Sequence, residues 1–227
     1  MSAASANSPH SLDNLFPPHL FALACDTGAG SVSVLFAEEF NLVKDAIPKR
    51  QQEFAAGRAL ARQAMTQLGM SSGCILRDAK GAPLWCEGSI GSISHSQNLV
   101  VAVLAERQRV KGVGVDVECR VRRFPWQALH TITVPGERAW LSTLPVHCRE
   151  IAAYCLFSAK ESVIKCLYSL GLPLLYFTQF CVQPDLALGH FSVTGIEAWS
   201  PHNVSLNGRL GWNQHYVFTG AWCLETI

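Results

Sequence analysis

The sequence predicts an α+β fold made of two similar subdomains related by a pseudo-twofold axis, each a long helix packed on a small, mostly antiparallel sheet. Two segments, 49–68 and 149–170, carry apolar side chains at helical spacing. Each is followed by three or four short runs rich in β-branched and aromatic residues. The chain has 227 residues, of which 49% are hydrophobic. That is enough apolar material for a core, so a largely disordered chain is excluded.

Both predicted helices have recognisable ends. The first follows Pro48, which suits a first helical turn, and stops before Gly69, which can supply a left-handed C-cap. The second stops at Gly171, with Pro173 just beyond it. The predicted strands are bounded by turn-forming sequences such as KGAP, SHSQN, QPD and NGR.

The repeated pattern of a helix followed by strands divides the chain in two. We expect a loose N-terminal arm over residues 1–14, an N-terminal subdomain over 15–118 and a C-terminal subdomain over 119–227. Clefts between such halves are common ligand sites, so the seam between them is where we expect a functional site.

Composition and charge exclude several classes of protein. The net charge is +1, so neither a strongly basic nucleic-acid-binding protein nor an acidic tail is expected. There is no run of ~18 apolar residues that would predict a membrane span. The nine cysteines are odd in number and show no CxxC spacing, which favours buried free thiols in a reducing compartment. The N-terminal residues lack the features of a signal peptide, so a cytoplasmic protein is expected.

The run VGVDVE at 113–118 carries the first candidate functional residues. Alternate residues of a strand face the same side, so the valines would enter the core while Asp116 and Glu118 project together, about 7 Å apart. Two carboxylates on one face repel unless a cation lies between them, and Mg²⁺, which prefers oxygen ligands, is the natural occupant. Taken alone, the pair is more typical of an ordinary solvated strand face.

The second helix carries the sequence FSAKESVIK at 157–165. Glu161 and Lys165 are four residues apart and share one helix face, whereas Lys160 projects about 100° to one side. A surface Glu–Lys pair is the simpler interpretation. The more specific one makes Glu161 a third carboxylate for the same cation and both lysines phosphate ligands.

Three further groups of residues could bind phosphate. The run GSISHS ends a predicted strand and offers a hydroxyl and an imidazole at Ser94 and His95. Arg50 and Arg58 lie two turns apart on the first helix, and Lys80 stands in the KGAP turn. Each group alone is explained as well by turn capping or by a solvated helix face.

Taken together, these five blocks change the interpretation. KRQQEFAAGR, KGAPLW, GSISHS, VGVDVE and FSAKESVIK occur in this order over residues 45–170 and resemble the motifs of the 4′-phosphopantetheinyl transferases. They look most like the two-lobed surfactin/enterobactin-type class, in the subgroup that contains enterobactin synthetase component D and the mycobacterial type-II enzyme. The length also fits this class better than it fits the short trimeric holo-carrier synthases.

The resemblance implies a role for each matching residue. Asp116, Glu118 and Glu161 match acidic Mg²⁺ ligands, with Mn²⁺ as the alternative metal, and Glu161 and Lys165 are the implied catalytic residues. The residues that match positions contacting coenzyme A are Arg50, Arg58, Lys80, Gly81, Pro83, Ser94, His95, Asp116, Lys160 and Lys165. The WxxKE-type motif begins here with Phe157 instead of Trp. One departure from the family pattern is that the turn reads Gly81-Ala82-Pro83 where many relatives have G-K-P, although Lys80 just before it fits the K-G-x-P variant of the named subgroup.

The resemblance also implies the reaction. The phosphopantetheine arm of coenzyme A would pass to a serine hydroxyl of an apo acyl or peptidyl carrier protein, releasing adenosine 3′,5′-bisphosphate, in siderophore, nonribosomal peptide or polyketide biosynthesis. Glu161, or a water held by the metal, would take the serine proton. A monomer is the expected oligomeric state. The alternatives are a metal-dependent hydrolase of CoA or of another nucleotide pyrophosphate, a non-catalytic CoA- or carrier-binding protein, and an α+β scaffold whose motifs are coincidental.

The segment just after the acidic strand is a candidate docking site for an acidic carrier. Arg120, Arg122 and Arg123 precede Phe124 and Trp126, which combines positive charge with apolar anchors. The alternative is a solvated loop between the halves with both aromatic side chains in the core.

Overall fold

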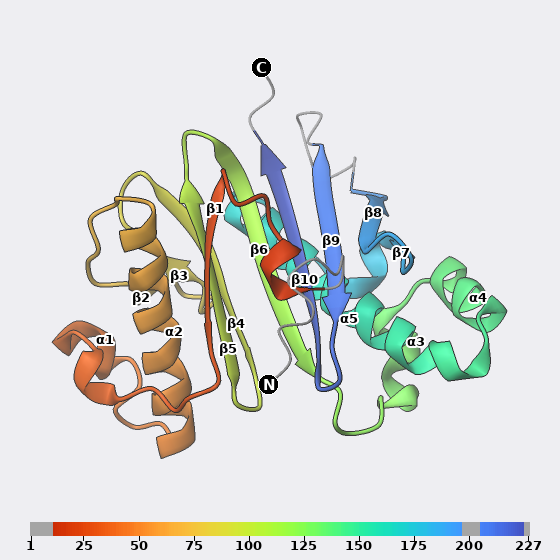
Figure 1. Cartoon of the computed structure of the whole chain (residues 1–227), viewed down its shortest axis with the longest axis horizontal. Coiled ribbons are helices and arrows are strands. Elements are labelled where there is room, and N and C mark those ends of the chain that lie inside the picture. The colour runs from red at the N-terminus through yellow and green to blue at the C-terminus, as the bar shows by residue number, and fades with distance from the viewer. Residues whose placement is uncertain (1–10, 197–204, 225–227) are drawn as a thin grey trace, which may run out of the picture.

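In the computed structural model, which describes residues 11–196 and 205–224, five α-helices, two larger antiparallel sheets and the two-stranded sheet β2-β3 confirm the α+β class (Figure 1). The helices are α1 (Ala37–Asn41), α2 (Pro48–Gln67), α3 (Leu129–Ile132), α4 (Pro135–Thr143) and α5 (Val146–Ser169). The strands are β1 (Phe21–Asp26), β2 (Leu76–Arg77), β3 (Pro83–Leu84), β4 (Ser89–Ser96), β5 (Leu99–Glu106), β6 (Val110–Cys119), β7 (Cys181–Asp185), β8 (His190–Thr194), β9 (Leu206–Trp212) and β10 (Tyr216–Leu224). The pseudo-twofold relation between the halves stays a prediction.

The N-terminal sheet has the strand order β1-β5-β4, and α2 covers one of its faces. Strand β5 alternates between the two faces: Val100, Ala102 and Leu104 pack against α2, whereas Val101 and Val103 pack against the other half of the molecule. A strand buried on both faces reads as a continuous apolar run, as LVVAVLAE does. α2 begins at Pro48 and matches the predicted helix to within one residue at each end.

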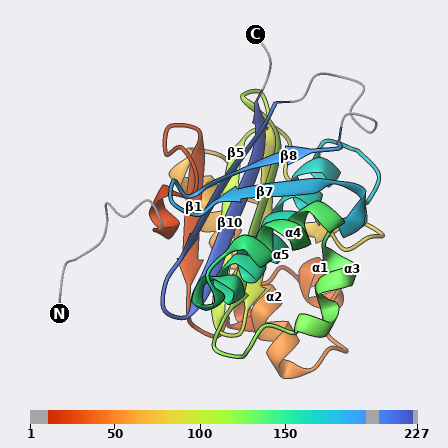
Figure 2. The ribbon, with the colours of Figure 1, turned by 90° about the vertical axis from the view of Figure 1, so that its right-hand side faces the viewer.

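The C-terminal sheet has the order β6-β10-β9-β8-β7, and α5 packs on β6 and β10. Strands β7 and β8 cross the direction of β10 in Figure 2, which shows how strongly this sheet twists. α5 starts at Val146, three residues before the predicted start, because Pro145 already serves as its N-cap. Short helices α3 and α4, which the sequence did not indicate, pack beside α5.

Strand β6 departs from the predicted division of the chain. The range expected for the N-terminal subdomain, 15–118, includes most of this strand. In the structure β6 pairs along its length with β10, which places it at the edge of the C-terminal sheet. Strand β1, which the sequence analysis left unassigned, pairs antiparallel with β5. In both pairs the partner strands are far apart in the sequence, so neither pairing leaves a local signal.

Strands β4 and β6 meet at the seam between the two sheets through side chains. Three alternate serines of β4 accept hydrogen bonds from the outward-facing N–H groups of β6. The pairs are Val115 N to Ser92 Oγ at 3.0 Å, Val117 N to Ser94 Oγ at 3.4 Å, and Cys119 N to Ser96 Oγ at 2.8 Å. We call these three side chains the serine seam. The edge of β6 is thereby satisfied without a backbone ladder.

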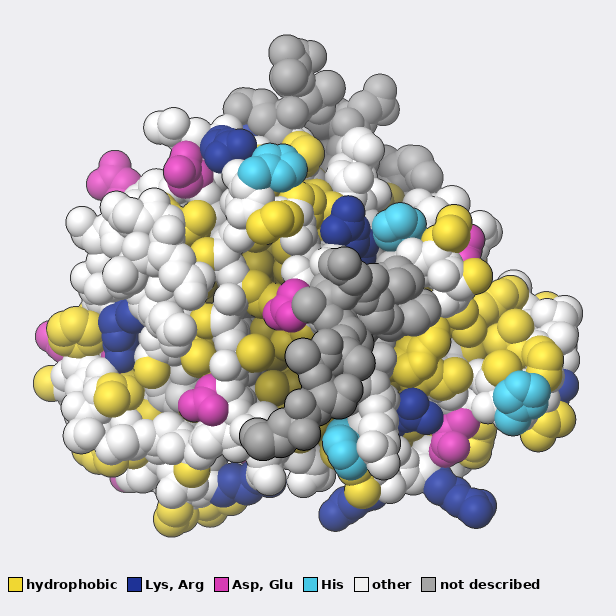
Figure 3. All heavy atoms as spheres, in the orientation of Figure 1, with side chains coloured by type: hydrophobic (Ala, Val, Ile, Leu, Met, Phe, Trp, Pro, Cys, Tyr) yellow, Lys and Arg dark blue, Asp and Glu magenta, His cyan; other side chains and the backbone are white. Residues whose placement is uncertain are grey.

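Part of the predicted N-terminal arm is packed on the fold. Residues 1–10 lie outside the described residues, but Leu12–Asn14 form a 3₁₀ turn, and Leu15 and Phe16 are buried against the seam. Figure 3 shows the face of the molecule seen in Figure 1, where charged side chains are scattered singly among apolar and polar ones. In the parts of the chain that the structure describes, every helix is too short or too polar to cross a bilayer.

Candidate active site

Nearly all of the predicted site residues line two adjoining cavities between the halves. Ten of the twelve line a cavity of about 390 Å³, namely Arg50, Arg58, Gly81, Pro83, Ser94, His95, Asp116, Glu118, Glu161 and Lys165. Lys80 lines the neighbouring cavity of about 420 Å³, which shares Gly81, Pro83, Glu161 and Lys165 with the first. Segments from five blocks of the chain therefore converge on one place, and only Lys160 is absent from it.

The acidic strand is arranged as its alternation predicts. Val113, Val115 and Val117 are buried in the core between the two sheets. The other face of β6 turns toward α5, and there a Cβ on Gly114 would overlap the Ser162 carbonyl oxygen. Glycine is thus needed for α5 to lie against the strand, and the same face continues into Asp116 and Glu118.

Asp116 is held by three side chains. Its Oδ1 accepts hydrogen bonds from Ser94 Oγ at 2.9 Å and from Lys165 Nζ at 2.7 Å, and its Oδ2 accepts one from Ser158 Oγ at 2.8 Å. Ser158 is fully buried and in turn lies 2.9 Å from the hydroxyl of Thr219. Asp116 is only 3% exposed, and both of its side-chain oxygens have hydrogen-bond donors in this set.

Ser158, Thr219 and Glu53 belong to the site although the sequence analysis missed them. Ser158 lies within the FSAKE run, three residues before Glu161, so its place on α5 could have suggested it. Thr219 comes from β10, opposite Asp116 in the strand register, and only the pairing of β6 with β10 reveals it.

The three predicted metal ligands share a cavity but not a coordination centre. Burial raises the pKa of Glu118 to about 8, and the charge of Asp116 adds to the effect while Lys165 opposes it. Burial also raises the pKa of Glu161, and Lys165 again opposes the shift. Three carboxylates against one lysine is a donor set whose chemistry suits a hard divalent cation. Within the described residues, however, no three His, Cys, Asp or Glu side chains lie close enough together to hold a metal ion.

His95 and Arg50 form a contact pair at the rim of the site. Arg50 Nη1 lies 2.7 Å from His95 Nε2, and an arginine can only donate, so Nε2 is an acceptor and the imidazole is neutral. Burial lowers the pKa of His95, against the opposing charge of Glu53, whose Oε2 is 3.7 Å from Nδ1. The pair presents a guanidinium and an imidazole to the cavity.

Arg58 is a buried cation at the back of the site. It is 5% exposed and donates to the carbonyl oxygens of Ile75 at 3.0 Å and Leu76 at 3.3 Å, with the Phe54 ring 3.9 Å from its Cζ. Burial lowers its pKa to about 10, so it stays charged at neutral pH. Its hydrogen-bond acceptors are neutral carbonyls, so its charge is available to attract an anion into the cavity.

Lys160 corrects the sequence analysis, which placed it on coenzyme A. Its side chain is 0% exposed and forms an ion pair of 2.9 Å with Glu137. Its Nζ also donates to the carbonyl oxygens of Phe177 at 2.5 Å and Phe180 at 2.9 Å. The rotation of about 100° from Glu161 points it into the core of the C-terminal half.

The predicted docking segment is divided between core and surface. Phe124 is 3% exposed and packs edge-on against Tyr154 at 5.2 Å, whereas Trp126 is 43% exposed. Arg122 and Arg123 are exposed and line, with Glu118 and Phe124, a cavity of about 360 Å³ beside the site. Phe124 therefore lies in the core, as the alternative interpretation expected, whereas Trp126 lies at the surface, as the docking interpretation expected.

Comparison with known families gives the same assignment. A model of the 4′-phosphopantetheinyl transferase N-terminal domain matches residues 38–105, and a model of the 4′-phosphopantetheinyl transferase superfamily matches residues 112–218. The chain belongs to this superfamily. The boundary between the two matches falls between β5 and β6, so it too groups β6 with the C-terminal half.

Three curated relatives are similar over more than half of the chain. The 4′-phosphopantetheinyl transferase Svp of Streptomyces mobaraensis is 39% identical over 68% of this chain and 63% of its own length. PptT of Mycobacterium tuberculosis is 37% identical over 59% of this chain and 58% of its own length. Enterobactin synthase component D of Salmonella typhi is 33% identical over 58% of this chain and 54% of its own length. The matched stretches thus span less than two thirds of each relative.

Among solved structures, a holo-(acyl-carrier-protein) synthase from Bacillus anthracis in complex with CoA (3′,5′-ADP) is similar to part of the chain. The TM-score is 0.41 at 14% identity, and the match covers 52% of this chain and 99% of that one.

Proposed function

We propose that the protein transfers the 4′-phosphopantetheine group of coenzyme A to a serine hydroxyl of an apo acyl or peptidyl carrier protein. The observation that carries this proposal is the convergence of ten residues from five separated motif blocks on one cavity that holds cations and carboxylates together. Membership of the phosphopantetheinyl transferase superfamily supports it.

In the proposed reaction, the serine oxygen bonds to the β-phosphorus of coenzyme A, and the bond from that phosphorus to the oxygen bridging it to the α-phosphate breaks. The leaving group is adenosine 3′,5′-bisphosphate, and the serine proton passes to a base. Negative charge on the reacting phosphates is the main obstacle, so catalysis depends on positioning and on charge stabilisation.

The residues of the cavity can divide this work. Arg58, Arg50 and Lys80 supply positive charge around the nucleotide phosphates. Lys165, 30% exposed, is placed to stabilise charge on the departing phosphate. Glu161 faces the same cavity, and we assign the serine proton to this side chain or to a water that it orients.

Asp116, Glu118 and Glu161 are the residues that would hold Mg²⁺, with Mn²⁺ as the alternative. When bound, the metal would neutralise charge on the pyrophosphate.

The carrier protein is proposed to dock next to this cavity. Carrier proteins of this kind are expected to be acidic, and the exposed guanidinium groups of Arg122 and Arg123 with the exposed ring of Trp126 offer charge and an apolar anchor. Charge reversal at Arg122 and Arg123 should raise the KM for the carrier with little effect on the KM for coenzyme A. An unchanged carrier KM would remove this docking surface.

The decisive experiment incubates the protein with coenzyme A, Mg²⁺ and a panel of apo carriers from siderophore, nonribosomal peptide, polyketide and fatty-acid synthesis. Intact mass spectrometry should show a gain of one phosphopantetheine group on at least one carrier, and adenosine 3′,5′-bisphosphate should appear in equal amount. Addition of a chelator should stop the reaction, and excess Mg²⁺ should restore it. Cleavage of coenzyme A without modification of any carrier would instead show a hydrolase.

A further inference from the structure

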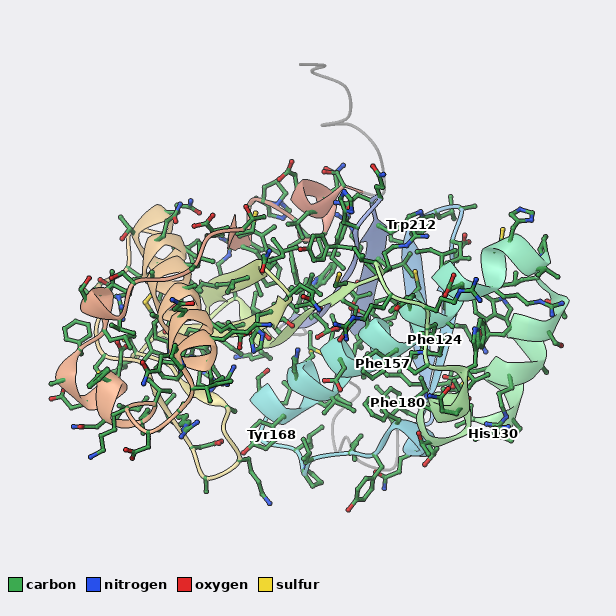
Figure 4. The ribbon with its side chains drawn as sticks, turned by 90° about the horizontal axis from the view of Figure 1, so that it is seen from below. Phe124, His130, Phe157, Tyr168, Phe180 and Trp212 are labelled. Carbon is green, nitrogen blue, oxygen red and sulfur yellow. The ribbon has the colours of Figure 1, made fainter. Side chains whose placement is uncertain are left out.

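A hydrogen bond between Asp78 and Tyr168 joins the two halves of the molecule beside the site. Tyr168 lies on α5, three residues beyond Lys165, and its hydroxyl donates to Asp78 Oδ2 at 2.6 Å across 90 positions of sequence. Figure 4 shows Tyr168 at the end of α5 beside the loop of the N-terminal half. Both residues line the cavity of about 420 Å³ that adjoins the site.

The other oxygen of the same carboxylate organises the KGAP turn. Asp78 Oδ1 accepts hydrogen bonds from the backbone N–H groups of Lys80 at 2.8 Å and Ala82 at 3.0 Å. Backbone bonds from Gly81 N to Asp78 O and from Asp78 N to Ala82 O close the turn, and Gly81 takes a φ of +91°. A single carboxylate thus shapes the turn and ties it to α5.

The pKa shifts of Asp78 and Tyr168 agree with a strong hydrogen bond between them. The hydrogen bond from Tyr168 is the main cause that lowers the pKa of Asp78, and the backbone N–H groups add to it. The same bond raises the pKa of Tyr168. Asp78 is therefore ionised at neutral pH and Tyr168 keeps its proton, as a charge-assisted hydrogen bond requires.

We propose that Asp78 and Tyr168 are positioning residues that fix the turn carrying Lys80 and Pro83 relative to Lys165 on α5, and so set the affinity for coenzyme A. This inference rests on the proposed function for its ligand. Neither side chain needs to touch the reacting atoms, because the pair acts by holding groups from the two halves at a set separation.

The test compares wild-type protein with Tyr168→Phe, which removes one hydroxyl and keeps the ring. Tyr176→Phe is the matched control, because Tyr176 is 77% exposed and lines neither of the two adjoining cavities. Three quantities are measured: hydrogen exchange of the peptide covering 78–85, the Kd of coenzyme A by calorimetry, and the melting temperature. We expect faster exchange in the turn and a Kd raised about tenfold in Tyr168→Phe, with kcat at saturating coenzyme A within about twofold of wild type.

Each outcome decides between explanations. Unchanged exchange in the turn, or an unchanged Kd despite a lowered melting temperature, would overturn the positioning role and leave only a structural contact. An effect on Asp78→Asn and Tyr168→Phe that adds fully in the double variant would likewise show that the two side chains do not act together. A wild-type protein that modifies no carrier would refute the proposed function, while the exchange measurement would still decide whether the pair holds the turn.

Discussion

Helix α5 carries two lysines, five residues apart, that each form an ion pair with a carboxylate. The two pairs have similar N–O distances but differ in burial and in surrounding charge. Lys160 and Glu137 lie 2.9 Å apart with side chains 0% and 1% exposed. Lys165 and Asp116 lie 2.7 Å apart with side chains 30% and 4% exposed. One pair is sealed in the core of the C-terminal half, and the other lies on the wall of a cavity.

The hydrogen-bond count of the lysines does not distinguish the two pairs. Each ammonium group has three acceptors: a carboxylate and two carbonyl oxygens for Lys160, and a carboxylate, a hydroxyl and one carbonyl oxygen for Lys165. The charge balance does distinguish them. Glu137 is matched by one lysine and two backbone N–H donors, whereas Lys165 faces Asp116 together with Glu118 and Glu161. Two further carboxyl groups next to open space, absent from the first pair, are what distinguish the second pair as a candidate site.

The difference between the two pairs is tested most directly by removing the buried lysine, Lys160. Lys160→Met should lower the free energy of unfolding by roughly 3–5 kcal/mol, because it leaves the Glu137 carboxylate buried without its cation. Urea denaturation measures the change, and Lys165→Met should cost less than half as much. Equal losses of stability in the two variants would show that the pairs are not of different kinds.

The next effect concerns turnover. Lys165→Ala, Glu161→Ala and Asp116→Ala should each lower kcat by at least ~100-fold, as is typical when a group that stabilises charge in the transition state is removed. Steady-state assays on folded protein check this, with folded Lys160→Met within a few-fold of wild type as the reference. Wild-type activity in Glu161→Ala would refute the proton-accepting role.

A smaller effect is expected from the serine that supports Asp116. Ser158→Ala removes the only side-chain donor to Oδ2 in the described structure, and kcat should fall about tenfold. Ser162→Ala is the matched control, since Ser162 is equally buried and, among the described residues, its hydroxyl donates only to the Ala159 carbonyl of its own helix. Similar activity in both variants would mean that Ser158 merely packs.

The smallest effect should come from the exposed turn. Lys80→Ala should raise the KM for coenzyme A several-fold with little change in kcat, because a solvated charge contributes about 1 kcal/mol or less. Lys44→Ala, exposed and outside both adjoining cavities, provides the comparison. A change confined to kcat would contradict a binding role.

Local patterns predicted most of the site. The alternation of VGVDVE predicts that Asp116 and Glu118 share a face, and the spacing of Glu161 and Lys165 predicts a common helix face. Both predictions hold because they concern neighbours along one element. The five motif blocks together indicated which elements converge, although spacing alone could not show where they meet.

The predictions that were wrong concern contacts between segments that are far apart in the sequence. Nothing near Lys160 in the sequence indicates that Glu137 and two carbonyls of the following loop enclose it. The pairing of β6 with β10, more than ninety residues later, likewise decides which half the acidic strand joins and brings Thr219 to Ser158. The periodicity of a sequence predicts which face of a helix or strand a side chain lies on, but it does not predict which distant residue packs against that face.

The serine seam has a consequence for how such a site can exist at all. If β4 and β6 were hydrogen-bonded through their backbones in one continuous eight-stranded sheet, the outward-facing carbonyl of Val115 would accept a hydrogen bond from a backbone N–H of β4. Because hydroxyls satisfy only the N–H groups, the carbonyl remains exposed to the gap and accepts Lys165 Nζ at 3.2 Å. The gap between the sheets is therefore what gives Lys165 this backbone acceptor, and the proposed active site lies where a continuous sheet would have left no space.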